Sequence, residues 1–165
     1  MTLFSNSFSA GVVGLDFTLK EEFELGAWGN MAIVSKLLST GEFNIFPAGA
    51  EKSRAEKLEY LFRNNKYHHL SVCNNSNRVR SNCGVCDKCI RTKLMLLSRG
   101  VDIPVELFDS IDVEKYLSRI SINKSTEAVF YNEITHGDSK LSSEIKSSLK
   151  NKLENYYSVL NIKML

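Results

Sequence analysis

The sequence predicts an α/β fold in which a partial parallel sheet is followed by a four-cysteine zinc knuckle and a helical C-terminal region. Three observations carry this prediction. Two short apolar runs each lead into a helical pattern, four cysteines gather between Cys73 and Cys89, and apolar residues recur at helical spacing over the remainder. The 165 residues are 43% hydrophobic, which is typical of one compact domain. We expect a single domain at 1–165, with an α/β core at 1–72, a zinc-binding segment at 73–100 and helices at 101–165.

The first predicted βα unit opens with an apolar strand at 11–17, which reads Gly-Val-Val-Gly-Leu-Asp-Phe. A helix is expected to follow at about 19–38. Gly26 and Gly29 weaken this helix, because glycine inside a helix costs about 1 kcal/mol relative to alanine.

The second predicted βα unit has a strand at 43–46, a turn at 47–49 and a helix at 51–62. The turn is expected because its sequence is Pro-Ala-Gly. A third short strand at 70–72 is predicted to deliver the chain to Cys73.

The second half of the chain is predicted to be helical. A helix should begin near Cys86 and stop at Gly100, and further helices are expected at 113–120 and 126–134. A long helix should follow Ser139, because one face carries an apolar stripe: Leu141, Ile145, Leu149, Leu153, Tyr157 and Leu160. We expect this stripe to pack against the same domain. Binding to a partner or to a membrane surface is the alternative.

The charge balance gives no indication of a partner. The chain has 21 basic and 19 acidic residues, a net charge of +2, which is too weak a field to indicate a polyanionic partner. No stretch resembles a secretory leader or a membrane span, and the cysteines are clustered rather than distributed as in a disulfide framework. We therefore expect a cytoplasmic protein that does not associate with membranes.

The cysteine spacing is the strongest chemical signal. The pattern Cys-x9-Cys-x2-Cys-x2-Cys predicts that Cys73, Cys83, Cys86 and Cys89 bind one structural Zn²⁺ tetrahedrally. Four protein ligands leave no position for water or substrate, which argues against catalysis at the metal. An iron–sulfur cluster and a thioredoxin-like redox pair are the alternatives.

Basic residues surround these cysteines in the sequence, namely Arg78, Arg80, Lys88, Arg91 and Lys93. Four thiolates around Zn²⁺ carry a net charge of about −2, so these cations have an electrostatic reason to be there. A nucleic-acid or phosphate surface is the alternative interpretation.

Cys73 together with the run Asn-Cys-Gly-Val-Cys-Asp-Lys-Cys-Ile-Arg-Thr at 82–92 resembles the C-terminal zinc region of PP-loop ATP pyrophosphatases related to 7-cyano-7-deazaguanine synthase. The segment 49–57, Gly-Ala-Glu-Lys-Ser-Arg-Ala-Glu-Lys, is similar to the turn and helix that precede this region in relatives of that synthase. The resemblance implies a partial Rossmann-like (HUP-type) core. The family binds ATP, adenylates a carboxylate and exchanges the adenylate for ammonia, which in the synthase makes a nitrile on a deazaguanine.

The family's phosphate-binding loop, Ser-Gly-Gly-x-Asp-Ser, is absent, and residues 9–14 supply neither its serine nor its aspartate at the needed positions. We therefore expect the C-terminal part of a PP-loop protein, with no catalysis alone. ATP would bind only when a missing N-terminal half completes the site. The expected partner is an ATP-binding subunit or a further copy in a homo-oligomer.

Three cations are candidate substrate-binding residues, while no catalytic residue is assigned. Arg54 and Lys57 share one helix face, and with Arg91 they would contact a nucleotide-like or carboxylate substrate. The competing interpretation makes them solvated charges beside local glutamates. The alternative function for the whole chain is a noncatalytic zinc module that binds a protein or a nucleic acid.

Overall fold

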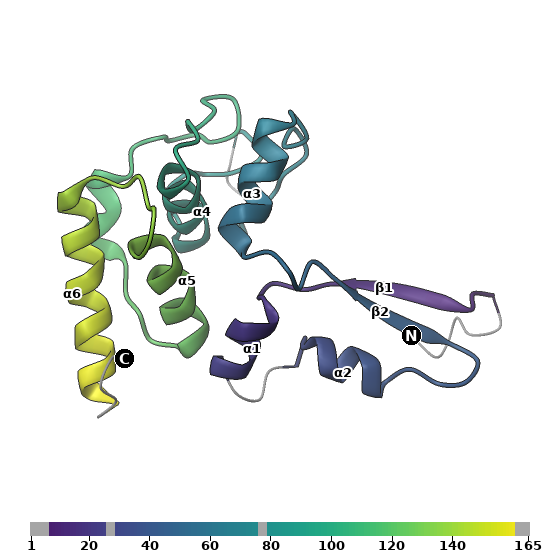
Figure 1. Cartoon of the computed structure of the whole chain (residues 1–165). Helices are drawn as coiled ribbons and strands as arrows, with labels where there is room; N and C mark the ends of the chain where they lie inside the picture. Colours follow the sequence, from purple (N-terminus) through teal and green to yellow (C-terminus); the bar gives the residue numbers. More distant parts are fainter. Residues whose placement is uncertain (1–6, 26–28, 76–78, 161–165) are drawn as a thin grey trace. The chain divides into compact units, whose positions relative to one another are not determined.

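The computed structural model describes residues 7–25, 29–75 and 79–160. The chain divides into two compact units, Met1–Lys57 and Leu58–Leu165. Figure 1 labels the helices and strands. The predicted single domain, with its segments at 1–72, 73–100 and 101–165, stays a prediction.

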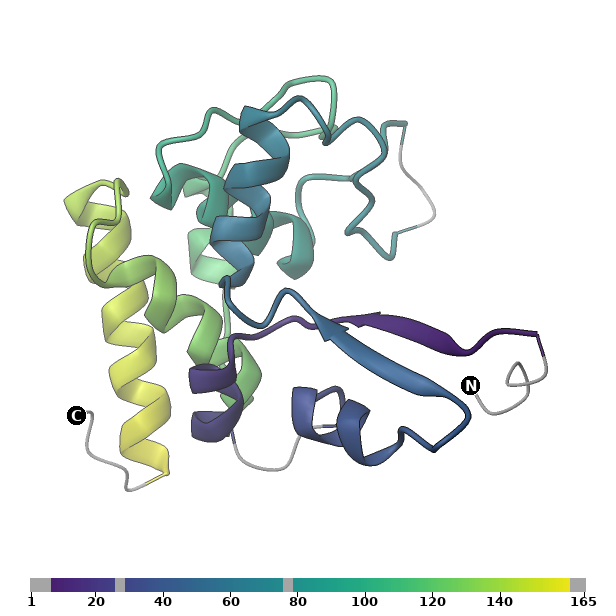
Figure 2. The same cartoon turned by 45° about the vertical axis from the view of Figure 1, so that its right-hand side comes forward.

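The first unit contains a two-stranded parallel sheet. Strand β1 (Ala10–Gly14) pairs with β2 (Asn44–Ala48), and Val12 lies opposite Phe46 in the register. Helices α1 (Leu19–Leu25) and α2 (Ala32–Leu37) connect the strands, and α2 packs along β2, as Figures 1 and 2 show. The predicted α/β character and the parallel pairing are confirmed.

The helix predicted at 19–38 is wrong as one continuous element. Residues 26–28, which include Gly26, lie outside the described residues, but Gly29 and Asn30 form a turn and α2 begins only at Ala32. The buried Glu22 carboxylate accepts a hydrogen bond of 3.0 Å from the Ala32 N–H. This contact satisfies one of the free N–H groups at the start of α2, so the second helix begins afresh.

The turn predicted at 47–49 is also wrong, since β2 continues through Pro47 to Ala48 and only Gly49 has a positive φ, of 84°. Proline is tolerated in this strand because its missing N–H lies on an edge of the sheet.

Helix α3 (Arg54–Arg63) begins later than the predicted 51. Its start is fixed by a capping box. The Ser53 N–H donates to Glu56 Oε2 at 2.8 Å, and the Glu56 N–H donates to Ser53 Oγ at 3.3 Å.

The second unit consists mainly of helices: α4 (Asp87–Ser98), the 3₁₀ helix η2 (Glu114–Arg119), α5 (Ser125–Thr135) and α6 (Ser143–Val159). Helix α4 is the centre of the core, with Ile90, Leu94, Met95 and Leu96 fully buried. Helices α5 and α6 lie side by side in Figures 1 and 2. The helix predicted at 113–120 exists only as the tighter 3₁₀ form.

Helix α6 confirms the predicted packing of its apolar stripe. Leu141, Ile145, Leu149 and Leu153 are buried, whereas Tyr157 is half-buried and Leu160 is exposed. The Ser142 side chain caps the helix by accepting from the Ile145 N–H. Within the described ranges, no helix is long and apolar enough to cross a bilayer.

The short strand predicted at 70–72 is wrong. The Leu70 carbonyl and the Val72 N–H both bond to the side-chain amide of Asn82, at 2.9 and 2.8 Å. A side chain therefore satisfies the backbone groups that a strand would have paired.

Candidate metal centre

The four cysteines reach one point from two separate stretches of the second unit. Cys73 lies in a segment without regular structure, Cys83 lies in the following loop, Cys86 is the N-cap residue of α4, and Cys89 lies in the first turn of that helix. Cys73, Cys83 and Cys89 are buried, and Cys86 is half-buried. The short x2 spacings place three of the sulfurs around the start of a buried helix.

The sulfur atoms are arranged as ligands of a single ion. Neighbouring Sγ atoms lie 3.3 Å (Cys73–Cys83), 3.7 Å (Cys73–Cys86), 3.9 Å (Cys83–Cys89) and 3.4 Å (Cys86–Cys89) apart, and all four lie within 4.8 Å of one another. Tetrahedral Zn–S bonds of about 2.3 Å imply separations of about 3.8 Å between sulfurs. None of these four cysteines forms a disulfide. The donor set therefore fits one tetrahedral metal ion.

Asn82 fixes the first ligand against the second. Its buried Oδ1 accepts from the N–H groups of Val72 and Cys73, at 2.8 and 3.2 Å, while its Nδ2 donates to the carbonyls of Leu70 and Leu107. Four hydrogen bonds from one side chain join three segments that are distant in the sequence. Because Cys83 follows Asn82 directly, this network sets the distance between Cys73 and Cys83.

Gly84 allows the knuckle to pack closely against a later loop. Its φ is 75°, a region that favours glycine. A Cβ atom at this position would lie 2.0 Å from the carbonyl oxygen of Ser110. The bend between Cys83 and Cys86 is thus held against Ser110, with no room for a side chain.

The protonation of the thiols differs around the site. Burial raises the pKa of Cys73, but hydrogen bonds from the backbone of Cys83 and Asn75 outweigh burial and lower this pKa to about 6. Burial dominates at Cys86 and Cys89 and raises the pKa of both thiols. Cys73 is therefore better prepared than Cys86 or Cys89 to offer a thiolate to a metal cation.

Lys93 is completely buried in α4, one helical turn after Cys89. Its Nζ donates to the carbonyls of Asp112 and Ser110, at 2.8 and 3.2 Å. Burial lowers the pKa of Lys93. The negative charges of Cys89, Asp112 and the other thiolates act in the opposite direction and raise this pKa in part. A cation held in this place would offset part of the negative charge of four thiolates.

The other predicted cations of this region are bound locally. The Arg80 guanidinium donates to the carbonyl of Phe108 at 2.9 Å, Lys88 donates to Asn74 Oδ1 at 3.2 Å, and Arg91 lies over the Phe130 ring at 4.6 Å. Arg78 lies outside the described residues. Each of the three described side chains thus has a contact within the protein, and the choice between charge offset and a phosphate surface stays a prediction.

The three predicted substrate-binding residues fall into two units. Arg54 and Lys57 lie on one face of α3 in the first unit, where Arg54 pairs with Asp16 at 2.6 Å and the Lys57 Nζ donates to the Leu15 carbonyl at 2.8 Å. Burial lowers the pKa of Lys57, opposed by the nearby Asp16. Arg91 belongs to the second unit. A shared role in binding a substrate stays a prediction.

The sequence predicted that Lys93 offsets thiolate charge, but neither the complete burial of Lys93 nor the structural role of Asn82 was predicted. Asn82 stands among turn-forming residues, and a charged residue such as Lys93 on a helix normally faces solvent. Their positions in the sequence could have indicated these roles, because Asn82 directly precedes a ligand and Lys93 lies one helical turn after Cys89.

Comparison of the chain with protein-family profiles, curated proteins and solved structures gave no match.

Proposed function

We propose that this chain is the zinc-stabilised C-terminal part of a PP-loop ATPase related to 7-cyano-7-deazaguanine synthase. The observation that carries the proposal is the group of four thiols at tetrahedral separation around the start of α4. These are the cysteines of the segment that resembles that family. The activity would be ATP-dependent modification of a deazapurine or another nucleotide-like substrate, exerted only together with an ATP-binding half.

Zinc is the metal that the donor set supports best. Four thiolates match the closed sites of structural zinc. An iron–sulfur cluster spreads its thiolates over several iron atoms, so some of its cysteine sulfurs must lie further apart than the 4.8 Å that contains all four sulfurs here. Bound zinc would link Cys73 and Cys83 to the start of α4 and would leave no position for substrate.

A Rossmann-like (HUP-type) core is part of the same proposal. Parallel pairing of β1 and β2, with helices in the connection between them, is the local arrangement from which such cores are built. Two strands form only a fraction of a doubly wound sheet, which agrees with a partial core.

The first unit supports a role for Arg54 and Lys57 near a nucleotide. Both side chains are anchored beside the end of β1, through Asp16 and the Leu15 carbonyl. Ligands of open parallel sheets bind at the carboxyl ends of the strands. Fixed cations at this end would attract a phosphate or a carboxylate.

Metal analysis and nucleotide binding test this function. Elemental analysis of the purified chain should give about one zinc per molecule, whereas iron with visible absorption would favour the cluster. ATP binding and pyrophosphate release should then be measured for the chain alone and with the products of neighbouring genes. Absence of nucleotide binding in every combination would refute the ATPase-related function and favour the noncatalytic zinc module.

A further inference from the structure

The two edges of the sheet in the first unit are not equivalent. The Asn44 N–H donates to the Ser9 carbonyl, and the Leu15 N–H donates to the Ala48 carbonyl. In a parallel pair of strands, every second residue of a strand directs its N–H and C=O groups to the neighbouring strand. Asn44 and Ala48 face β1 in this way, so the backbone groups of Ile45 and Pro47 point to the outer edge of β2. Ser39 Oγ accepts from the Ile45 N–H at 2.8 Å, and Pro47 has no N–H to offer. The outer edge of β2 is closed.

The outer edge of β1 is open. The same alternation directs the N–H and C=O groups of Ala10 and Val12 away from β2. Neither residue has another hydrogen-bond partner within the part of the chain that the structure describes. No lysine or proline protects this strand, although natural edge strands usually carry such a device.

One face of the same sheet is bare. Val12 and Phe46 lie side by side across the strands, and they are 70% and 55% exposed. The remaining residues of this face are uncharged: Ala10, Gly14, Asn44 and Ala48. On the opposite face Ile45 is buried, and α2 packs along β2 (Figure 2).

A parallel sheet is normally covered by helices on both faces, and three or more strands are needed for independent stability. A second copy paired through β1 would leave the bare face uncovered, and a copy stacked on that face would leave the edge open. A parallel strand with its attached helix covers both. We propose that the outer edge of β1 and the face formed by Val12 and Phe46 bind a strand–helix unit of another α/β domain.

The docking surface is inferred from the sheet alone, and only the identity of the partner as an ATP-binding domain rests on the proposed function.

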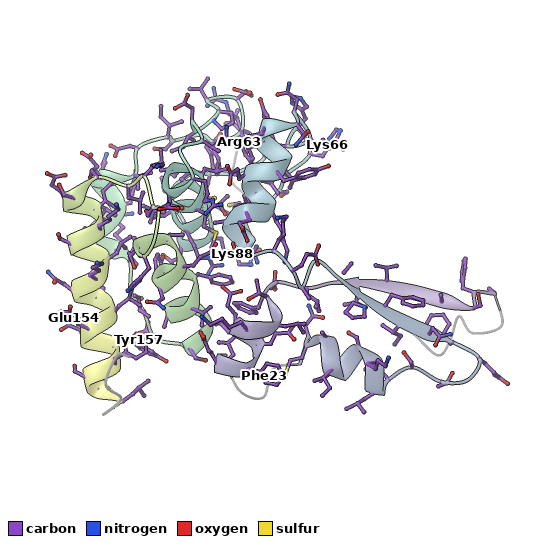
Figure 3. All side chains as sticks on the ribbon, viewed as in Figure 1. Phe23, Arg63, Lys66, Lys88, Glu154 and Tyr157 are labelled. Carbon is purple, nitrogen blue, oxygen red and sulfur yellow. The ribbon has the colours of Figure 1, made fainter. Side chains whose placement is uncertain are left out.

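The test places a photo-crosslinking amino acid, benzoylphenylalanine, at position 12 of the full chain in the cells that produce it. Position 23 serves as the control, because Phe23 is 80% exposed on α1 and lies outside the sheet (Figure 3). The polypeptide cross-linked through position 12 is then purified and titrated with the chain.

Three variants separate the edge from the face. Ala10→Pro removes only an outward N–H and spares the ladder to β2, Val12→Lys places a charge on the bare face, and Phe23→Lys is the control. We expect an α/β polypeptide whose affinity falls at least tenfold with Ala10→Pro and with Val12→Lys but is unchanged with Phe23→Lys. Amide exchange of Ala10 and Val12 should slow in the complex.

Absence of a cross-link at position 12, a cross-link to a second copy, or binding that is insensitive to Ala10→Pro would overturn the inference. A partner that binds through β1 but does not bind ATP would refute the proposed function and leave the docking surface intact. Circular dichroism and metal content of each variant show that the fold is preserved, since Ala10 and Val12 are exposed.

Discussion

The side-chain oxygen of Asn82 accepts a hydrogen bond from the backbone N–H of Cys73 at 3.2 Å. Through this bond, a residue that cannot itself bind the metal positions one of the metal's ligands. Asn82 is fully buried and makes three further hydrogen bonds. The metal centre therefore depends on a neutral amide as well as on four thiols.

Replacement of Asn82 by alanine should destabilise the second unit and weaken metal binding. The change leaves the buried N–H groups of Val72 and Cys73 without an acceptor, at about 1–3 kcal/mol each. We expect a loss of roughly 2–4 kcal/mol in the free energy of unfolding and faster release of zinc to a chelator. Asn151→Ala, at an exposed position on α6, is the matched control. Unchanged stability of Asn82→Ala would contradict the assigned network.

Cys86→Ser should abolish stoichiometric metal binding. Cys86 is the most exposed of the four ligands, so serine can be accommodated sterically and the effect reports on the metal. Structural zinc supplies roughly 10–16 kcal/mol of binding free energy in zinc-finger peptides, and loss of part of this should lower the melting temperature markedly. The exposed neighbour Asp87 provides the control Asp87→Asn, which should keep the metal. Equal metal content in both variants would refute the site.

Gly84→Ala should be far more disruptive than Gly137→Ala. Both glycines have positive φ, of 75° and 61°, so an alanine at either position costs about 1–2 kcal/mol. Only at Gly84 would the added Cβ meet backbone, 2.0 Å from the Ser110 oxygen, whereas nothing lies within 4 Å at Gly137. The difference in urea-unfolding midpoints between the two variants isolates this clash. Similar midpoints would show that the knuckle does not pack on Ser110.

Glu59 should make the stability of the second unit pH-dependent. Hydrogen bonds from Arg99 and then Arg63, both of 2.8 Å, lower the pKa of Glu59 from its ordinary 4.5. Because the pKa is lower in the folded state, the stabilisation is present above pH 4.5 and is lost as pH falls through the folded-state pKa.

Glu59→Gln should accordingly cost about 1 kcal/mol at pH 7 and less near pH 3, as measured by urea unfolding at both values. Glu154→Gln on α6, an exposed position (Figure 3), should have little effect at either pH. A cost for Glu59→Gln that is the same at both pH values would contradict a role of the carboxylate charge.

Local patterns predicted much of the second unit. Apolar spacing located α4, α5 and α6, because a helix that buries one face must repeat that face about every 3.6 residues. Cysteine spacing identified Cys83, Cys86 and Cys89 as close neighbours, since two intervening residues allow sulfurs to meet around one ion. These features depend on residues near one another in the chain.

Contacts between distant residues were not predictable in this way. The break before α2 depends on Glu22 reaching the N–H of Ala32, and the absence of a strand at 70–72 depends on the amide of Asn82. Burial of Lys93 likewise requires the carbonyls of Ser110 and Asp112 to surround its nitrogen. None of these pairings leaves a periodic signal.

By itself, the sequence determined that four thiols converge and that helices follow them, because both facts arise from short-range spacing. Only the tertiary structure decided which groups hold the thiols in place and which edge of the sheet remains open. The physical reason is that a buried or unpaired polar group takes its partner from whatever backbone the fold brings within about 3 Å, and that partner can come from anywhere in the chain.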